Sequence, residues 1–201
     1  MSSSELSIQQ LEYQFVGPID LEINSTQCIG LSGESGCGKS LLLRAIADLD
    51  EHKGNVLLNG INANEISAPQ WRKQVAMLPA DSQWWFDTVG EHFNQPDKKM
   101  LIQMGFAEAA LAWSVSRVST GEKQRLALLR LFENKPVILL LDEPTANLDY
   151  NNTLLFESIV LNYLQENNAC AIWVSHDLDQ LNRVAETKFK LEAGQLVQQS
   201  C

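Results

Sequence analysis

Short apolar runs alternate with segments of helical periodicity along most of the chain. Four runs have the length and composition of buried strands: 28–32, 75–78, 137–142 and 169–175. Apolar residues at helical spacing predict four helices between and after them: 41–46, 121–133, 151–167 and 178–184. Strands that alternate with helices form a largely parallel sheet covered on both faces, so an α/β fold is expected.

Antiparallel hairpins are expected on both sides of this core. Residues 8–15 and 19–23 alternate apolar with polar side chains around the turn-forming Gly-Pro pair at 17–18. A second hairpin is centred on the Asn-Gly pair at 59–60, and a closing hairpin lies around residues 193–194. The first strands are predicted to form a separate antiparallel sheet that flanks the parallel one.

The composition changes between residues 81 and 118. This stretch holds three of the five tryptophans, together with two methionines and an alanine-rich segment. We expect it to form a helical subdomain of two or three short helices. Residues 1–80 and 119–201 are then predicted to fold together as the β-subdomain and the α/β core of one single domain.

Size and charge narrow the class of protein. The chain has 201 residues, enough for one well-buried core but not for two domains of ordinary size. Its formal net charge of −10 gives a surface that repels phosphate backbones, so nucleic-acid binding is not expected. No apolar run in the sequence approaches the roughly 20 residues needed to span a bilayer. The protein is therefore expected to be soluble, and to meet a membrane only through a partner.

The four cysteines, Cys28, Cys37, Cys170 and Cys201, lie far apart and form no C-x-x-C pair. A disulfide framework or a zinc site is therefore not expected. Reduced thiols in a cytosolic protein are predicted instead.

A glycine-rich loop carries the clearest chemistry. Residues 33–40, between a predicted strand and a predicted helix, fit the P-loop pattern G-x-x-x-x-G-K-[ST]. Such a loop turns its backbone N–H groups towards phosphates, while Lys39 can reach the β/γ oxygens and Ser40 can bind Mg²⁺. The alternative is a glycine-rich turn with a chance lysine. The candidate nucleotide-binding residues are Gly33, Ser35, Gly36, Cys37, Gly38, Lys39 and Ser40.

Two adjacent carboxylates follow the most apolar strand. Asp142 and Glu143 come after the apolar residues 137–141, at the edge where open α/β sheets bind ligands. Asp142 would hold Mg²⁺ through a water molecule, and Glu143 would orient or deprotonate the attacking water. Two acids at a strand end are alternatively mere solubility charges, an interpretation that the P-loop weakens.

Ser119 begins a further motif, 23 residues before Asp142. With Glu122 three residues later it forms a helix-capping box, and a helix N-terminus with a free hydroxyl is also an anion site. The run 118–125, V-S-T-G-E-K-Q-R, resembles the signature L-S-G-G-E-K-Q-R of ATP-binding-cassette (ABC) proteins. The order of P-loop, signature and carboxylate strand also matches that family, and the resemblance covers essentially the whole chain.

The resemblance identifies further residues. Residues 146–149 look like the family's D-loop, and His176, which follows an apolar strand, looks like its switch histidine. Tyr13 is placed like the aromatic residue that stacks on adenine. For His176 the alternative is a structural histidine whose hydrogen bonds are satisfied within the fold. The fold that the resemblance implies is a P-loop NTPase (RecA-like) core with a flanking antiparallel β-subdomain and a shortened helical subdomain.

The family's activity is ATP hydrolysis, with ATP and Mg²⁺ bound at the P-loop. The resemblance therefore implies an ATPase in which Lys39, Glu143 and His176 are catalytic, beside Ser40 and Asp142 in the same subunit.

The family's subunits pair head to tail and hold two ATP molecules between them. This implies a homodimer in the ATP-bound state, in which Ser119 and Gly121 reach the γ-phosphate of the partner's ATP. Asp149 would cross the interface near the opposite site. Because phosphoryl transfer is catalysed by positioning and charge stabilisation, donors from a second subunit make hydrolysis depend on assembly.

Two positions depart from the family's pattern. The glutamine of its Q-loop should fall at Ala80, whose methyl group can neither bind Mg²⁺ nor orient water, and Gln83 would replace it only if the loop bends. Thr120 replaces the first signature glycine, and a β-branched side chain crowds a backbone that approaches phosphate closely. Both changes are expected to slow hydrolysis without abolishing ATP binding.

The helical insert is also shorter than usual in the family, where it docks a membrane partner. The aromatic run 84–86, W-W-F, lies where the docking groove should be. We expect one or two of these three rings to be exposed as part of a binding surface. The alternative is that all three pack the shortened subdomain.

Three functions remain open at this point. The first is the energising subunit of a transporter, cytoplasmic and peripheral on the inner face of the cell membrane, paired with an integral membrane permease. Residues 86–89 and 172–177 are most similar to small cassettes of the iron- or metal-export type. The alternatives are a soluble ABC clamp or assembly factor, and a regulatory ATP-binding module with little turnover, which Ala80 and Thr120 favour.

Overall fold

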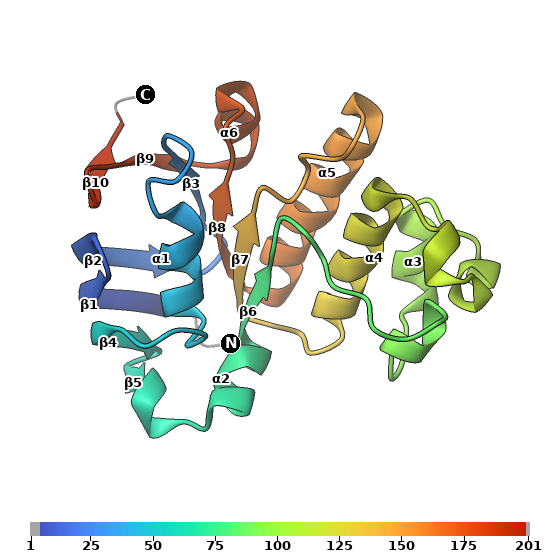
Figure 1. Ribbon diagram of the computed structural model, residues 1–201, viewed down its shortest axis with the longest axis horizontal. Helices are drawn as coiled ribbons and strands as arrows, with labels where there is room; N and C mark the ends of the chain where they lie inside the picture. Colours follow the sequence, from blue (N-terminus) through green and yellow to red (C-terminus); the bar gives the residue numbers. More distant parts are fainter. Residues whose placement is uncertain (1–4, 200–201) are drawn as a thin grey trace.

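The computed structural model describes residues 5–199, whose strands form two sheets (Figure 1). The larger sheet is built from β3 (Cys28–Ser32), β6 (Val75–Leu78), β7 (Ile138–Asp142), β8 (Cys170–Val174), β9 (Thr187–Glu192) and β10 (Gln195–Gln198). Its order is β10-β9-β3-β8-β7-β6, and all neighbours are parallel except β10 and β9. The smaller sheet is built from β1 (Glu5–Tyr13), β2 (Val16–Asn24), β4 (Lys53–Leu58) and β5 (Ile61–Asn62). It is antiparallel, in the order β2-β1-β4-β5, as predicted for a flanking sheet.

Helices cover both faces of the larger sheet. The α-helices within the described residues are α1 (Lys39–Ile46), α2 (Ala68–Gln74), α3 (Lys98–Gln103), α4 (Thr120–Phe132), α5 (Tyr150–Asn167) and α6 (Leu178–Val184). Short 3₁₀ turns add η1 (Ala63–Glu65), η2 (Gly90–His92), η3 (Glu108–Ala112) and η4 (Val115–Arg117). Figure 1 shows α1, α2 and the smaller sheet on one side of the larger sheet, and α4 and α5 on the other. No helix of residues 5–199 combines the length and the apolar character needed to cross a bilayer.

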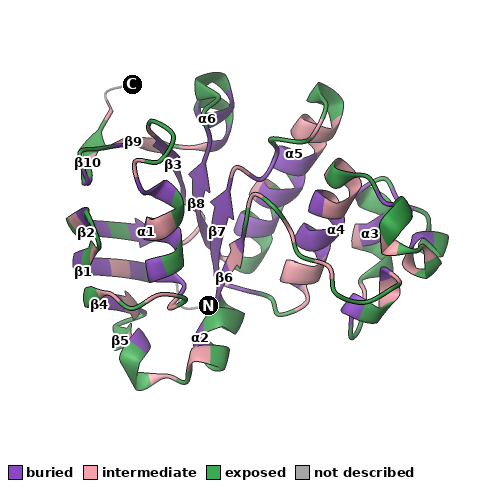
Figure 2. Ribbon diagram, in the orientation of Figure 1, coloured by how far each residue is buried: buried purple, intermediate pink, exposed green. Residues whose placement is uncertain are grey.

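The strand β7 divides the apolar interior into two cores. Its side chains alternate between the faces of the sheet, so that Ile138 and Leu140 pack with α1 and the smaller sheet. Leu139 and Leu141 pack with α4 and α5 on the opposite face. Buried residues therefore line both sides of the sheet (Figure 2). A strand that is apolar throughout is required because both of its faces are covered.

The first hairpin turns at a different place from the one predicted. The turn lies at Gln14 and Phe15, and the Gly-Pro pair at 17–18 belongs to β2. Gln14 takes the positive φ of 51° that the turn requires. The N–H of Gly17 donates instead to the carbonyl oxygen of Gly194, which joins this hairpin to the closing hairpin of the larger sheet.

The insert 81–118 is less helical than predicted. It contains one α-helix, α3, and the three turns η2, η3 and η4. Its buried side chains, among them Val89, Leu101 and Phe106, belong to the same apolar core as Leu139 and Leu141 of the sheet. The short segments suffice because the insert packs on the core of the sheet. The predicted boundary of a separate helical subdomain stays a prediction.

Helix α2 was not predicted from the sequence. It begins with a proline in its first turn and buries one side chain completely, Trp71, whose Nε1 donates to the carbonyl oxygen of Ile46 at 3.0 Å. The neighbouring Arg72 and Lys73 lie exposed on its outer face. Cys28, Cys37 and Cys170 are free thiols, and Cys201 lies outside the described residues.

A buried polar network holds together the elements that follow β7. Gln180 of α6, only 2% exposed, exchanges hydrogen bonds with the hydroxyl of Thr145 at 2.9 and 3.1 Å. Its amide also donates to Glu157 of α5 at 2.9 Å and accepts from Nε1 of Trp173 in β8 at 3.2 Å. Arg183 binds the same Glu157 carboxylate with two hydrogen bonds. The network therefore ties α5, α6 and β8 to the segment just after Glu143.

We expect Gln180→Met to lower the free energy of unfolding by about 2–4 kcal/mol, because three buried polar partners lose a hydrogen bond each. Urea denaturation monitored by circular dichroism measures this. The matched control is Gln165→Met on the exposed face of α5, which should change stability by less than about 0.5 kcal/mol. Equal effects of the two substitutions would show that the network contributes nothing specific.

Candidate functional site

The P-loop connects β3 to α1 at the carboxyl edge of the larger sheet. Gly38 is the N-cap of α1 and has a φ of +108°, a conformation that L side chains rarely adopt. A Cβ at this position would lie 2.4 Å from Cγ2 of Val16 in β2. Glycine is therefore required both by the backbone conformation and by the close approach of the flanking sheet.

Lys39 lies inside the loop. Its ammonium group donates to the carbonyl oxygens of Gly33 at 2.8 Å and of Glu34 at 2.9 Å. The side chain is buried, and these contacts hold its charge at the centre of the loop. Both acceptors are neutral, so the positive charge remains available to a phosphate oxygen.

A cavity of about 320 Å³ opens beside the P-loop. Its lining combines the end of β7, the segment just after β8, the loop after β6 and the P-loop itself. The residues are Ser35, Gly36, Gly38, Lys39, Ser40, Leu41, Ala80, Asp142, Glu143 and His176. Most of the residues predicted to bind or hydrolyse the nucleotide therefore lie together, since parallel strands end at the same edge of the sheet. We call this space the nucleotide cavity.

Glu143 and His176 face each other in this cavity. Nε2 of His176 lies 3.3 Å from Oε1 of Glu143, at ion-pair distance, although this oxygen accepts no hydrogen bond within residues 5–199. Glu143 has a φ of +46°, a strained conformation for a non-glycine residue, and its N–H donates to the carbonyl oxygen of Val174. Strain at a half-buried carboxylate is typical of functional sites.

Burial raises the pKa of Glu143, while His176 and Lys39 oppose this shift. A carboxylate with a raised pKa is a better general base than an exposed one. The oxygen donors Ser40 and Asp142 line the same cavity, and a hydroxyl together with a carboxylate suits a hard divalent cation such as Mg²⁺. The oxygen atoms of Ser40 and Asp142 therefore fit the Mg²⁺ ion of the predicted Mg-ATP.

The signature segment lies outside the nucleotide cavity. Ser119 caps α4: its hydroxyl accepts from the N–H of Glu122, whose carboxylate accepts from the N–H of Ser119. Thr120 is the first residue of the helix and is exposed. A Cβ at Gly121 would lie 2.8 Å from the carbonyl oxygen of Asn147. Glycine at this position thus lets the signature pack against the 146–149 segment of its own chain.

Asp149 also has a local role. Its carboxylate caps α5 by accepting from the N–H of Asn152 at 2.9 Å, and these bonds hold its pKa below the usual value. Ser119, Gly121 and Asp149 are not among the residues that line the nucleotide cavity of their own chain. Their predicted contacts across a dimer stay predictions.

Phe15, rather than Tyr13, lies close to the P-loop. Its ring atom Cε2 is 3.3 Å from the position that a Cβ at Gly38 would take, and 58% of the residue is exposed. The hydroxyl of Tyr13 lies near Asp50, beyond the far end of α1. Arg44 is the main cause that holds the pKa of Asp50 below its usual value, and the hydroxyl of Tyr13 adds to this shift. Stacking of Tyr13 on adenine stays a prediction, and Phe15, in the turn at 14–15, is the aromatic residue whose ring approaches Gly38 of the loop.

Ala80 lines the nucleotide cavity, so the position of the family's Q-loop glutamine carries only a methyl group. Gln83 does not replace it. Its amide lies 3.4 Å from the carbonyl oxygen of Asp81, and Gln83 is not part of the cavity lining. The loop does not bend in the way that would bring the side chain of Gln83 into the cavity in place of the missing glutamine.

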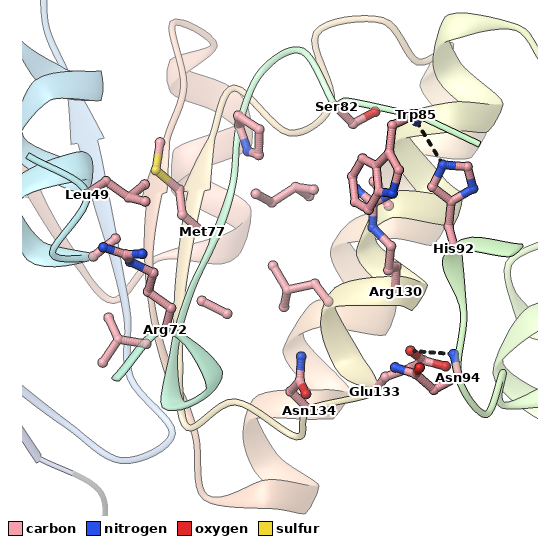
Figure 3. A pocket seen from close by; sticks show the side chains of 17 residues that line it. Leu49, Arg72, Met77, Ser82, Trp85, His92, Asn94, Arg130, Glu133 and Asn134 are labelled. Carbon is pink, nitrogen blue, oxygen red and sulfur yellow. Dashed lines mark hydrogen bonds between the residues drawn. The ribbon is translucent and has the colours of Figure 1, made fainter. Parts of the chain in front are cut away.

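A second cavity, of about 390 Å³, lies between the core and the insert (Figure 3). We call it the groove. Its lining includes Leu49, Arg72, Met77, Trp85, His92 and Arg130. Trp85 is 63% exposed and Phe86 48%, whereas Trp84 packs against the core, so the prediction of one or two exposed rings is confirmed. Nε2 of His92 accepts from the backbone N–H groups of both Trp85 and Phe86, which holds the backbone at these two residues in place.

We expect Phe15→Ala to weaken ATP binding by roughly tenfold, because stacking of one base on one aromatic ring contributes about 1–3 kcal/mol. Tyr13→Ala should leave the affinity within about twofold. Titration with a fluorescent ATP analogue measures both variants. A larger loss for Tyr13→Ala than for Phe15→Ala would assign the adenine to Tyr13 instead.

We expect Glu143→Gln to raise the melting temperature of the nucleotide-free protein at pH 7.5. The carboxyl binds its proton more tightly in the folded than in the unfolded state, so ionisation destabilises the fold once the pH exceeds the unfolded pKa. Near pH 4 both states are protonated to a similar extent, so the difference between variant and wild type should disappear. Differential scanning calorimetry at the two pH values tests this, and a lower melting temperature at pH 7.5 would contradict it.

Comparison with known proteins identifies the family. A family model described as ABC transporter matches residues 16–146. Similar relatives include the probable iron export ATP-binding protein FetA of Escherichia coli K12, 28% identical over 90% of this chain and 88% of the relative. Another is the aliphatic sulfonates import ATP-binding protein SsuB 2 of Pseudomonas aeruginosa, 31% identical over 92% of this chain and 69% of the relative.

A solved structure confirms the P-loop NTPase fold. The ATP-bound structure of a bacterial Atm1-family ABC exporter superposes on this chain with a TM-score of 0.84 at 20% identity. The match covers 96% of this chain and 38% of the exporter chain. The match of the family model over most of the chain, together with the nucleotide cavity, shows that the protein belongs to the ABC transporter family and is one of its ATP-binding ATPases.

Proposed function

We propose that two copies of the chain pair head to tail, hydrolyse Mg-ATP at two composite sites and so energise transport through a separate integral membrane permease. The observation that carries this proposal is that one segment lines both cavities. Ala80 lines the nucleotide cavity, while Leu78, Pro79, Ser82 and Trp85 line the groove. A single segment of the chain therefore joins the nucleotide cavity to the groove, an arrangement that suits a protein coupling ATP to a bound partner.

Within one subunit, Lys39 neutralises charge on the β and γ phosphates and Glu143 accepts the proton of the attacking water. His176, which faces Glu143 at 3.3 Å, orients this carboxylate and the γ-phosphate. Ser40 and Asp142 would hold Mg²⁺, which when bound stabilises the charge that develops on the transferred phosphoryl group.

Across the dimer, Ser119 and the N-terminus of α4 donate to the γ-phosphate of the partner's ATP, where the helix dipole favours an anion. Support comes from two large apolar side chains beside the site, Tyr150 and Leu178, which are 68% and 57% exposed. Tyr150 directly follows Asp149, and Leu178 lies two residues after His176. Exposed apolar side chains around a polar site are typical of an interface.

The groove is proposed to receive a cytoplasmic segment of the permease. The groove is lined by the exposed indole of Trp85 and by the apolar side chains of Leu49 and Met77. A concave apolar surface of this kind can bind an amphipathic helix. The protein would then be peripheral on the inner face of the cell membrane. The net charge of −10 supports a protein partner over nucleic acid.

A low-turnover regulatory module is the second candidate, favoured by the methyl group of Ala80 in the nucleotide cavity. Steady-state hydrolysis separates the two functions. For the proposed transporter subunit we expect measurable Mg-ATP turnover that Glu143→Gln abolishes, together with an ATP-dependent dimer of Glu143→Gln in light scattering. Absence of both turnover in the wild type and the dimer in the variant would overturn the catalytic proposal.

We expect Ala80→Gln to raise kcat several-fold, because an amide at this position can orient the attacking water, whereas Ala80→Leu should not. An unchanged kcat in Ala80→Gln would show that the missing amide is not what limits turnover.

Co-purification tests the membrane partner. The full chain with an affinity tag, expressed in its own cells, is isolated from detergent-solubilised membranes, and a multi-helix membrane protein should accompany it in stoichiometric amount. The double variant Trp85→Ser/Phe86→Ser removes the exposed aromatic rings and should lose this partner while its ATP-dependent dimer persists. Recovery of the chain in the soluble fraction alone would favour a soluble ABC ATPase.

A further inference from the structure

Residues 79–86, which we call the linking loop, run between the nucleotide cavity and the groove. Four hydrogen bonds tie this loop to segments that follow it in the chain. The carbonyl oxygens of Pro79 and Gln83 accept from side chains of α4, and the N–H groups of Trp85 and Phe86 donate to His92. The loop is thus attached to the insert and to α4.

Gln124 makes the first attachment. Its side chain is 3% exposed, and Nε2 donates to the carbonyl oxygen of Pro79 at 2.9 Å. This carbonyl group directly precedes Ala80, the loop residue in the nucleotide cavity. A buried amide that leaves its acceptor would lose a hydrogen bond and leave polar groups unpaired, so Pro79 is expected to follow α4 when the helix moves.

Arg130 makes the second attachment, about 9 Å further along the same helix. Its Nη2 donates to the carbonyl oxygen of Gln83 at 3.1 Å. Its guanidinium also stacks on two rings of the loop, 4.7 Å from the centroid of Trp84 and 4.9 Å from that of Trp85. Figure 3 shows Arg130 beside Trp85 at the wall of the groove.

The other end of α4 is the signature. Ser119 caps the helix five residues before Gln124, and the intervening turn is held by the capping box. A helix of this length moves as a rigid rod, so a displacement at Ser119 reaches Gln124 and Arg130 together. At the loop's own nucleotide cavity, by contrast, Ala80 offers no polar group that a phosphate or its cation could pull.

We propose that the linking loop of each subunit senses the ATP bound in its partner's P-loop, through α4 and the side chains of Gln124 and Arg130. The inference rests on the proposed head-to-tail dimer, and Gln124 and Arg130 are positioning residues in it. The groove of one subunit is then controlled by the nucleotide that its Ser119 contacts. By thermodynamic reciprocity, a segment bound in that groove changes the ATP affinity of the partner's P-loop.

A mixed dimer with one intact site tests the proposal. Both chains carry Glu143→Gln, which suppresses turnover; one chain also carries Lys39→Ala and the other Ser119→Arg. The only complete site then combines the P-loop of the Ser119→Arg chain with Ser119 of the Lys39→Ala chain. 5-Fluorotryptophan is incorporated into one chain at a time, and ¹⁹F NMR resonances of Trp84 and Trp85 are assigned with Trp84→Phe and Trp85→Phe.

On addition of Mg-ATP we expect these resonances to shift in the Lys39→Ala chain, whose own P-loop is disabled. They should stay unchanged in the Ser119→Arg chain, which holds the ATP in its P-loop. The reverse pattern, or equal shifts in both chains, overturns the proposal. Light scattering reports dimer formation separately: a mixed dimer without the expected asymmetry overturns this inference alone, and failure to dimerise overturns the proposed function with it.

The positioning residues are tested in the same mixed dimer. Gln124→Met or Arg130→Gln in the Lys39→Ala chain should abolish the ATP-dependent shift of Trp85 while the dimer still forms. Arg130→Lys, which keeps the charge over the rings, should restore part of it. The matched control is Arg117→Gln, which removes an arginine that stacks on Trp113 outside the linking loop and should leave the shift intact. An unchanged shift in both Gln124→Met and Arg130→Gln would contradict the proposed route.

Discussion

The parallel pairing of β3 with β8 and of β8 with β7 is the constraint on which the site depends. Parallel strands place their carboxyl ends at one edge, so the P-loop meets Glu143 and His176, although more than a hundred residues separate it from them in the chain. Both faces of these strands are buried, which fixes their register. The arrangement of residues around the nucleotide cavity is therefore set by the packing of the core rather than by the loops themselves.

The same packing holds Glu143 in a conformation that a free chain would avoid. A positive φ and partial burial of the carboxylate both oppose folding, and the network of Gln180, Thr145 and Glu157 supports the adjacent segment against this strain. The strained Glu143 thus lowers stability, and the hydrogen-bond network a few residues away raises it. Ser119, by contrast, caps α4 through hydrogen bonds with Glu122 and is exposed.

Much of this architecture could be predicted from the sequence, since buried strands such as β3 and β7 are continuous apolar runs and the P-loop has an unmistakable spacing. Features that depend on tertiary contacts could not. Tyr13 and Phe15 have the same sequence character, and only the turn between them decides which ring approaches Gly38. Gln124 looks like an ordinary helix residue, and its bond to Pro79 depends on two segments 45 residues apart. Helix α2 is short, and Trp71 alone gives it no periodicity.

The central claim is that a complete hydrolytic site needs two chains, and mixing two inactive variants tests it most directly. Lys39→Ala disables the P-loop and Ser119→Arg disables the signature, so neither homodimer contains a complete site. The account predicts that an equimolar mixture regains ATP hydrolysis, because each mixed dimer contains one site with both groups intact. A mixture that stays as inactive as its two components would contradict it.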